Sequence, residues 1–115
     1  MNLLPGVDDA VIPADKLTRY SLDSDRQPDK ATAFRRALGY TSDNADVLIA
    51  DIKCNLHCYP AISKGHNGWG ETYDIILNLC GPNGKNANVL TAWIVRDGET
   101  FPRLTNVYVT EKRLR

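Results

Sequence analysis

The second half of the sequence contains runs of β-type residues separated by turn sequences, and this pattern restricts the fold more than any other feature. Residues 73–80 and 89–95 are rich in β-branched and aromatic side chains, and Gly81-Pro82-Asn83-Gly84 between them has the composition of a tight turn. Asp97-Gly98 predicts a second hairpin turn before a third run at 101–109. Short connections join antiparallel neighbours, so we expect an antiparallel sheet of three or four strands.

The first half of the sequence has a different period. Residues 12–22, 30–40 and 41–59 place apolar side chains three or four positions apart, which predicts amphipathic helices. Thr41 or Ser42 can cap the last of these helices at its N-terminus.

This order of elements predicts one α+β domain over residues 1–115. Two or three N-terminal helices, within about 12–59, would cover one face of a sheet formed by about 62–110, and the other face would be available for a site. The longest apolar run is far shorter than the ~20 residues of a membrane span, and the N-terminus lacks the basic and apolar regions of a secretion signal. We therefore expect no membrane association.

The formal net charge is zero, which is not typical of a nucleic-acid-binding protein. Residues 1–51 nevertheless hold nine Asp/Glu against six Lys/Arg, whereas residues 52–115 hold five against eight. This split either gives the sheet-forming half a mildly basic face or is a scatter of solvated surface charge.

The cysteine pattern does not favour disulfides or a metal. Three cysteines cannot form a complete set of intrachain disulfides. Cys54 and Cys58 flank His57, with Cys80 distant, and this is a poor zinc set because a structural zinc needs four ligands. We expect buried, reduced cysteines that pack as small hydrophobic residues, and neither a metal nor a cofactor.

The Gly84-Lys85 pair resembles part of a phosphate-binding loop. However, Leu79 and Asn86 stand where that motif needs glycine and Ser/Thr, and a strand-like run follows instead of a helix. The pair is better interpreted as part of a turn.

Longer stretches of the chain resemble a bacterial and phage domain family. They are "VIPADKLTRY", Lys30-Ala31 with Phe34 and "ALGY", "WGETYDI", and "GPNGK" through "VLTAWIV" to "FPRLTNVYV". Members of that family stand alone beside a small partner gene, or form the C-termini of phage head-associated and filamentous-haemagglutinin-type (contact-dependent growth inhibition) polymorphic toxins. They are similar to the barnase–EndoU–colicin–RelE superfamily of small ribonuclease toxins, in which helices precede a four-stranded antiparallel sheet.

The resemblance implies a toxin domain that cleaves tRNA or another structured RNA without a metal ion. It would act in the cytoplasm of the target cell, either alone or as the C-terminal part of a larger secreted protein. A cognate immunity protein would neutralise it. The basic excess of the C-terminal half predicts that this partner is acidic and covers the sheet face around Arg103. Two other functions stay open: a non-enzymatic phage or bacterial protein-interaction domain, and a different small enzyme on the same scaffold.

The resemblance also implies site residues. The family's helix lysine matches Lys30, its Gly-x-x-Tyr matches Gly70 and Tyr73, its strand Ser/Thr and Trp match Thr91 and Trp93, and its Pro-Arg-Leu-Thr matches Pro102, Arg103, Leu104 and Thr105, with Tyr108 after it. Two positions depart from the family pattern. Leu90 stands where many members have arginine, and "DRQPD" stands where many have His-Gly before the helix lysine.

Cleavage of RNA through its 2′-hydroxyl needs a base, an acid and positive charge at the phosphate. The chain offers cations, hydroxyl groups and aromatic rings for these tasks, and each of them also has a structural alternative as a strand or surface residue. The catalytic candidates are Lys30, Thr91, Arg103, Thr105 and Tyr108, and the substrate-binding candidates are Tyr73, Trp93, His66 and Lys85.

The hairpin register tests whether these candidates can meet. If Asp97-Gly98 is a two-residue turn, Ala92 opposes Arg103. Arg103 then faces one side of the sheet and Tyr108 the other. The candidates would share one face only if a bulge at Pro102 shifted the register.

Overall fold

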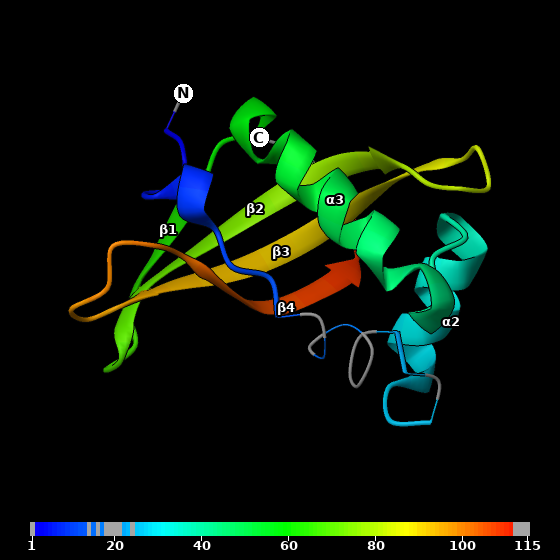
Figure 1. Cartoon of the computed structure of the whole chain (residues 1–115), viewed down its shortest axis with the longest axis horizontal. Helices are drawn as coiled ribbons and strands as arrows, with labels where there is room; N and C mark the ends of the chain where they lie inside the picture. The colour runs from blue at the N-terminus through cyan, green and yellow to red at the C-terminus, as the bar shows by residue number, and fades with distance from the viewer. Residues whose placement is uncertain (1, 14, 16, 18–21, 24, 112–115) are drawn as a thin grey trace.

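The computed structural model describes residues 2–13, 15, 17, 22–23 and 25–111. Its elements are η1 (Val7–Asp9), α2 (Pro28–Ala37), η3 (Ser42–Asn44), α3 (Ala45–Asn55), η4 (Leu56–Cys58), β1 (Ile62–His66), β2 (Gly70–Cys80), β3 (Asn86–Arg96) and β4 (Arg103–Val109). The strands form one antiparallel sheet in the order β1-β2-β3-β4 (Figure 1), which confirms the predicted α+β class. The helix predicted at 12–22 falls largely outside the described residues. Neither α2 nor α3 is long and apolar enough to cross a membrane.

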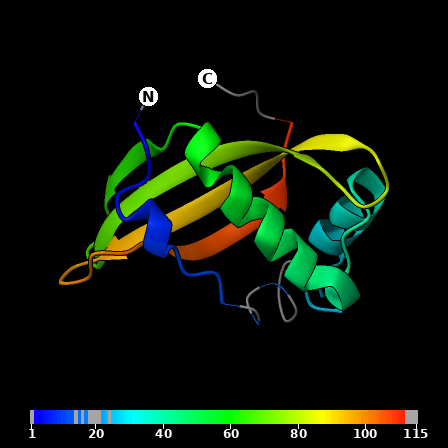
Figure 2. The same cartoon turned by 45° about the horizontal axis from the view of Figure 1, so that its top comes forward.

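Helix α3 lies across one face of the sheet (Figures 1 and 2). Thr41 caps the 3₁₀ turn that precedes it, in a reciprocal pair with Asn44, as the capping prediction expected. Leu48, Ile52 and Leu56 form the buried stripe of the helix and its 3₁₀ extension, because they are spaced four residues apart. The domain core lies between this stripe and the sheet.

Tyr40 links α2 to α3 within that core. Its ring meets the edge of Phe34 from α2, with the ring centroids 6.3 Å apart, and its hydroxyl donates to a carboxylate oxygen of Asp51 in α3. Burial, helped by the Asp51 carboxylate, raises the pKa of Tyr40 above its ordinary value. The phenol therefore remains a hydrogen-bond donor at any physiological pH.

The turn between β2 and β3 packs against the C-terminal end of α2. The backbone N–H of Asn83 donates to the Leu38 oxygen at 3.2 Å. Gly81 lies so close to the same carbonyl that a Cβ atom there would be 2.0 Å from the oxygen. The predicted turn is confirmed, and glycine is required at position 81 because two backbone segments touch there.

The predicted register of β3 and β4 is wrong. Ala92 pairs with Asn106 and Ile94 pairs with Arg103, and a register shift between Ala92 and its neighbour leaves Thr105 as the extra residue. The bulge therefore lies at Thr105 inside the strand, and not at Pro102.

Contacts with the N-terminal segment explain the difference. The backbone N–H of Val11 donates to the Pro102 oxygen at 2.9 Å, and the N–H of Leu104 donates to the Val11 oxygen at 3.0 Å. Residues 97–102 consequently form a longer connection than a two-residue turn. A local turn signal contains no information about this long-range pairing.

The bulge decides which side chains share a face. Thr91 and Trp93 point toward the core side, where Val107 and Leu104 oppose them. We call the opposite side the outer face, and in the described part of the chain no helix lies across it (Figures 1 and 2). On β3 and β4 the outer face comprises Leu90, Ala92, Ile94, Arg96, Arg103, Asn106 and Tyr108, with the bulged Thr105 beside them.

The two edges of the sheet differ. Strand β1 forms one edge, all five of its residues are exposed, and a register shift between Ser63 and Gly65 leaves Lys64 unpaired in the ladder. At the other edge, Val11 forms a parallel bridge with Arg103 of β4.

The prediction of buried cysteines is wrong. Cys54, Cys58 and Cys80 are free thiols, and all three are exposed. Cys54 and Cys58 lie off the stripe that α3 and η4 turn toward the core, and Cys80 is the last residue of β2.

Candidate functional site

Thr91 and Trp93, two of the predicted site residues, lie in the core. The Thr91 hydroxyl donates to the Ile75 oxygen at 2.9 Å and accepts from the Trp93 indole N–H at 2.8 Å. Both side chains are buried, and Tyr73 pairs with Trp93 and packs against the same core. RNA could reach Thr91 or Trp93 only if the core opened, so we assign these two residues a structural role.

Thr91→Val is expected to lower the free energy of unfolding by about 1–3 kcal/mol, because the valine leaves the buried Trp93 N–H without its acceptor. Urea denaturation followed by circular dichroism measures this loss. Thr105→Val is the matched control, since the Thr105 hydroxyl bonds the Ala92 oxygen at an exposed position. The control should change stability by less than about 0.5 kcal/mol, and equal losses in both variants would contradict the assigned role.

Arg103 is already engaged by a carboxylate. Its Nε and Nη2 atoms donate to the two carboxylate oxygens of Glu99 at 3.1 and 3.0 Å, and its guanidinium stacks 5.0 Å from the Phe101 ring centroid. The hydrogen bonds from Arg103 hold the pKa of Glu99 below its usual range. The Arg103 guanidinium, a predicted catalytic group, therefore binds two residues of the loop before β4, Glu99 and Phe101.

Lys30 and Tyr108 come together although they lie 78 positions apart in the chain. The Lys30 ammonium lies 5.6 Å from the centroid of the Tyr108 ring and donates to the Asn106 side-chain oxygen at 2.9 Å. An open pocket of about 290 Å³ lies beside them. We call this pocket the Lys30 cleft, and its lining is Asp29, Lys30, Ala33, Tyr108 and Val109.

Helix α2 and the Thr105 bulge position these groups. Pro28 starts α2, so Lys30 lies in the first helical turn, beside the C-terminal end of β4. The bulge turns Tyr108 to the outer face, opposite Leu90. Among the described residues, the Tyr108 hydroxyl has no hydrogen-bond partner and is free to contact a ligand.

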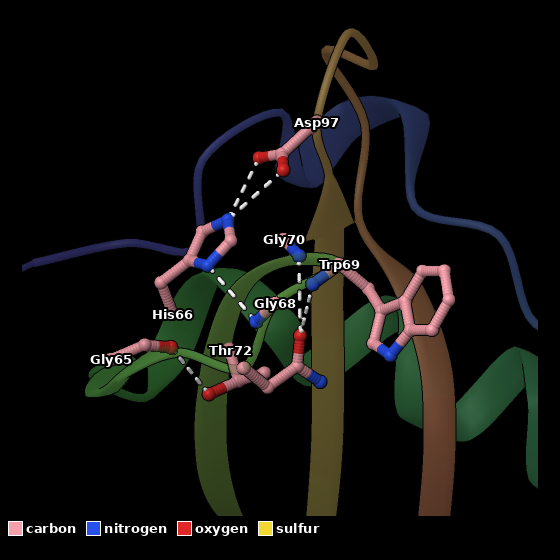
Figure 3. Close-up of polar contacts among 8 residues, drawn as sticks. Gly65, His66, Gly68, Trp69, Gly70, Thr72 and Asp97 are labelled. Carbon is pink, nitrogen blue, oxygen red and sulfur yellow. Dashed lines mark hydrogen bonds and ion pairs between the residues drawn. The ribbon is translucent and has the colours of Figure 1, made fainter.

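His66 is the last residue of β1, directly before the loop that leads to β2 (Figure 3). Its Nε2 atom is 3.0 Å from both carboxylate oxygens of Asp97, and its Nδ1 atom accepts from the backbone N–H of Gly68 at 3.0 Å. The acceptor role of Nδ1 places the proton of the neutral ring on Nε2. Both ring nitrogens are thus engaged, one by Asp97 and one by the Gly68 backbone, which limits His66 as a proton acceptor for a substrate.

Trp69 follows this histidine and is the most exposed large apolar side chain in the described residues, at 76%. Its indole points away from the His66–Asp97 pair (Figure 3). A pocket of about 550 Å³ adjoins it. We call this the Trp69 pocket, and its lining is Gly68, Trp69, Ile94, Arg96, Asp97 and Thr105.

The remaining candidate, Lys85, lies apart from both pockets. It is exposed in the turn between β2 and β3, where its N–H donates to the Asn83 side chain. The structure therefore brings Lys30 and Tyr108 together in the Lys30 cleft and places Thr105 in the Trp69 pocket. Lys85 lines neither pocket.

Residues 3–111 match a family described as "Domain of unknown function (DUF6883)". The chain belongs to the DUF6883 family. No curated protein and no solved structure matches it significantly.

Sequence reasoning missed most of the residues that line the two pockets of the DUF6883 domain or complete their contacts, and three of them bear on the chemistry: Asp29, Asn106 and Trp69. Asp29 and Asn106 adjoin two predicted residues, but no motif singled them out. Trp69 did carry a signal, because it stands between Gly68 and Gly70 in a loop, where a tryptophan has no strand partner to cover it.

Proposed function

We propose that this DUF6883 domain is a small endoribonuclease that works without a metal ion, with the Lys30 cleft as its active site. The observation that carries the proposal is the meeting of Lys30 and Tyr108. Both were candidates from the sequence, they come from a helix and a distant strand, and both residues line one open pocket. A ligand can therefore contact both at once.

The groups of the cleft suit cleavage through the 2′-hydroxyl. The Lys30 ammonium has three N–H donors, and Asn106 uses one, which leaves others for phosphate oxygens as negative charge develops. Asp29 is the carboxylate of the cleft and serves as the acceptor for the 2′-hydroxyl proton. The Tyr108 hydroxyl serves as the donor to the leaving 5′-oxygen. The 2′-hydroxyl, the phosphate oxygens and the leaving 5′-oxygen would then each contact one group of this chain.

The same proposal includes the biological role implied by the resemblance. The domain would share the barnase/RelE-like architecture, act on tRNA or another structured RNA, and be held inactive by an acidic immunity protein on the outer face. Arg96 on the outer face and Lys30 beside Tyr108 of that face support this role, because positive charge there fits an acidic surface or an RNA backbone. The engaged Arg103 moves the expected centre of contact from that residue to Lys30.

The test is cleavage by the purified domain. We expect it to cut unfractionated tRNA in the presence of EDTA and to leave 2′,3′-cyclic phosphate ends. RNA with 2′-O-methyl sugars should stay intact, because the nucleophile is blocked. Inducible expression should arrest growth, and co-expression of the neighbouring partner gene should relieve the arrest. Intact tRNA together with harmless expression would contradict the proposal and favour a non-enzymatic interaction domain.

A further inference from the structure

Trp69 is exposed in a way that requires explanation. Tryptophan has the largest apolar surface of any side chain, and most proteins bury the greater part of it. Here 76% of the residue is accessible, whereas Trp93, the other tryptophan, is 1% exposed. An exposed indole beside a pocket is a feature of ligand-binding surfaces.

The loop holds the Trp69 backbone in one place. The N–H of Trp69 donates to the Asn67 side chain at 2.9 Å (Figure 3). Its carbonyl accepts from the Asp97 N–H at 3.0 Å. The next residue, Gly70, packs so tightly on β3 that a Cβ atom would be 2.2 Å from the Val95 oxygen. The indole is therefore presented from a fixed backbone, which lowers the entropic cost of binding.

The lining of the Trp69 pocket indicates the kind of ligand. The indole offers a flat aromatic surface, and Ile94 adds an apolar contact. Arg96 brings a positive charge, while the Asp97 carboxylate and the Thr105 hydroxyl oxygen can accept hydrogen bonds. A flat heterocycle with N–H groups and an attached phosphate matches all of these features.

We infer that the Trp69 pocket binds an unpaired base of an RNA strand, which stacks on the indole. This rests on the proposed function and adds a substrate-binding site to it. Thr105 of the pocket and Tyr108 of the Lys30 cleft are three residues apart on β4, which corresponds to about 10 Å. One extended strand can thus lie along β4 with its base at Trp69 and a backbone phosphate at Lys30. A single-stranded or looped RNA fits this path, because its bases are free to stack.

The intrinsic fluorescence of the domain tests the inference without any cleavage. The probe is a short single-stranded oligonucleotide with 2′-O-methyl sugars, which the enzyme cannot cut. Stacking should quench the exposed Trp69 and leave the buried Trp93 unaffected. Trp69→Ala should weaken binding of a fluorescein-labelled form of the probe by about ten- to a hundred-fold. Trp69→Phe should recover most of the affinity, because phenylalanine keeps an aromatic face.

The outcomes separate this inference from the proposed function. If Lys30→Ala abolishes cleavage but the probe still quenches Trp69, both hold. If the wild-type domain binds the probe through Trp69 but cleaves no RNA, the stacking site holds and the proposed function fails. If tRNA is cleaved while Trp69→Ala binds the probe as tightly as the wild type, the inference is overturned. Absence of quenching at low salt, including a case where Trp69 proves to contact a protein partner instead, also overturns it.

Discussion

Lys30→Ala is expected to slow RNA cleavage by about a hundred-fold or more, which is the usual effect of removing one preorganised charge or donor from a transition state. Lys30 is the cation of the cleft, and its ammonium is held in place by Asn106 and the Tyr108 ring. The alanine variant leaves the phosphate without positive charge at the point of reaction. Single-turnover cleavage of tRNA, with the domain in excess, measures the effect separately from product release.

Two further variants make this result specific. Lys53→Ala removes the same charge from the exposed side of α3, across the sheet from the cleft, and should keep the wild-type rate. Tyr108→Phe retains the ring beside Lys30 and removes only the hydroxyl, so its loss of rate reports proton donation. Thermal melting of each variant shows whether the fold is preserved. A fully active, folded Lys30→Ala domain would exclude the Lys30 cleft as the active site.

Gly81→Ala is expected to destabilise the domain by about 3 kcal/mol, near the upper end of the usual range for overpacking. The new methyl group would meet the Leu38 carbonyl oxygen at 2.0 Å, and both partners are backbone, so neither can rotate away. The turn between β2 and β3 would have to separate from the end of α2. For a chain of this size the midpoint of thermal unfolding should fall by roughly 10 °C.

Gly84→Ala, in the same turn, is the matched control. Gly84 has a φ of +81°, but no atom lies within 4 Å of the position that its Cβ would occupy. Its replacement therefore adds only backbone strain, of about 1–2 kcal/mol. If Gly84→Ala proved as damaging as Gly81→Ala, the contact between the turn and α2 would not explain the need for glycine.

The parts of the fold that could be predicted are those that depend on neighbouring residues. The cap at Thr41, the stripe of α3 and the turn at 81–84 all follow from local spacing and local backbone preference. The pairing of β3 with β4 could not be predicted, because β4 carries a bulge at Thr105 and pairs at its start with Val11, some 90 positions away in the chain. The cysteine prediction failed for a similar reason, since burial depends on which side of α3 meets the sheet.

The candidate site was predictable in its members more than in its arrangement. Resemblance selected Lys30 and Tyr108, but it equally selected Thr91 and Trp93. A family motif contains residues that stabilise the sheet as well as residues that form a site, and the sequence does not distinguish them. Only the register separates the two groups. Arg103 shows a further limit, since its partner Glu99 lies in a loop whose shape no pattern indicated.

The contrast between the two edges of the sheet affects how the domain behaves in a crowded solution. An open edge strand invites a second molecule to extend the sheet, which is a common route to aggregation. Here β1 carries an exposed lysine and an irregular ladder, while the Val11 segment lies along part of β4. The irregular β1 edge and the Val11 segment beside β4 both discourage the addition of a strand from a second molecule. The domain can therefore keep the exposed Trp69 side chain while both edges of the sheet discourage uncontrolled strand pairing.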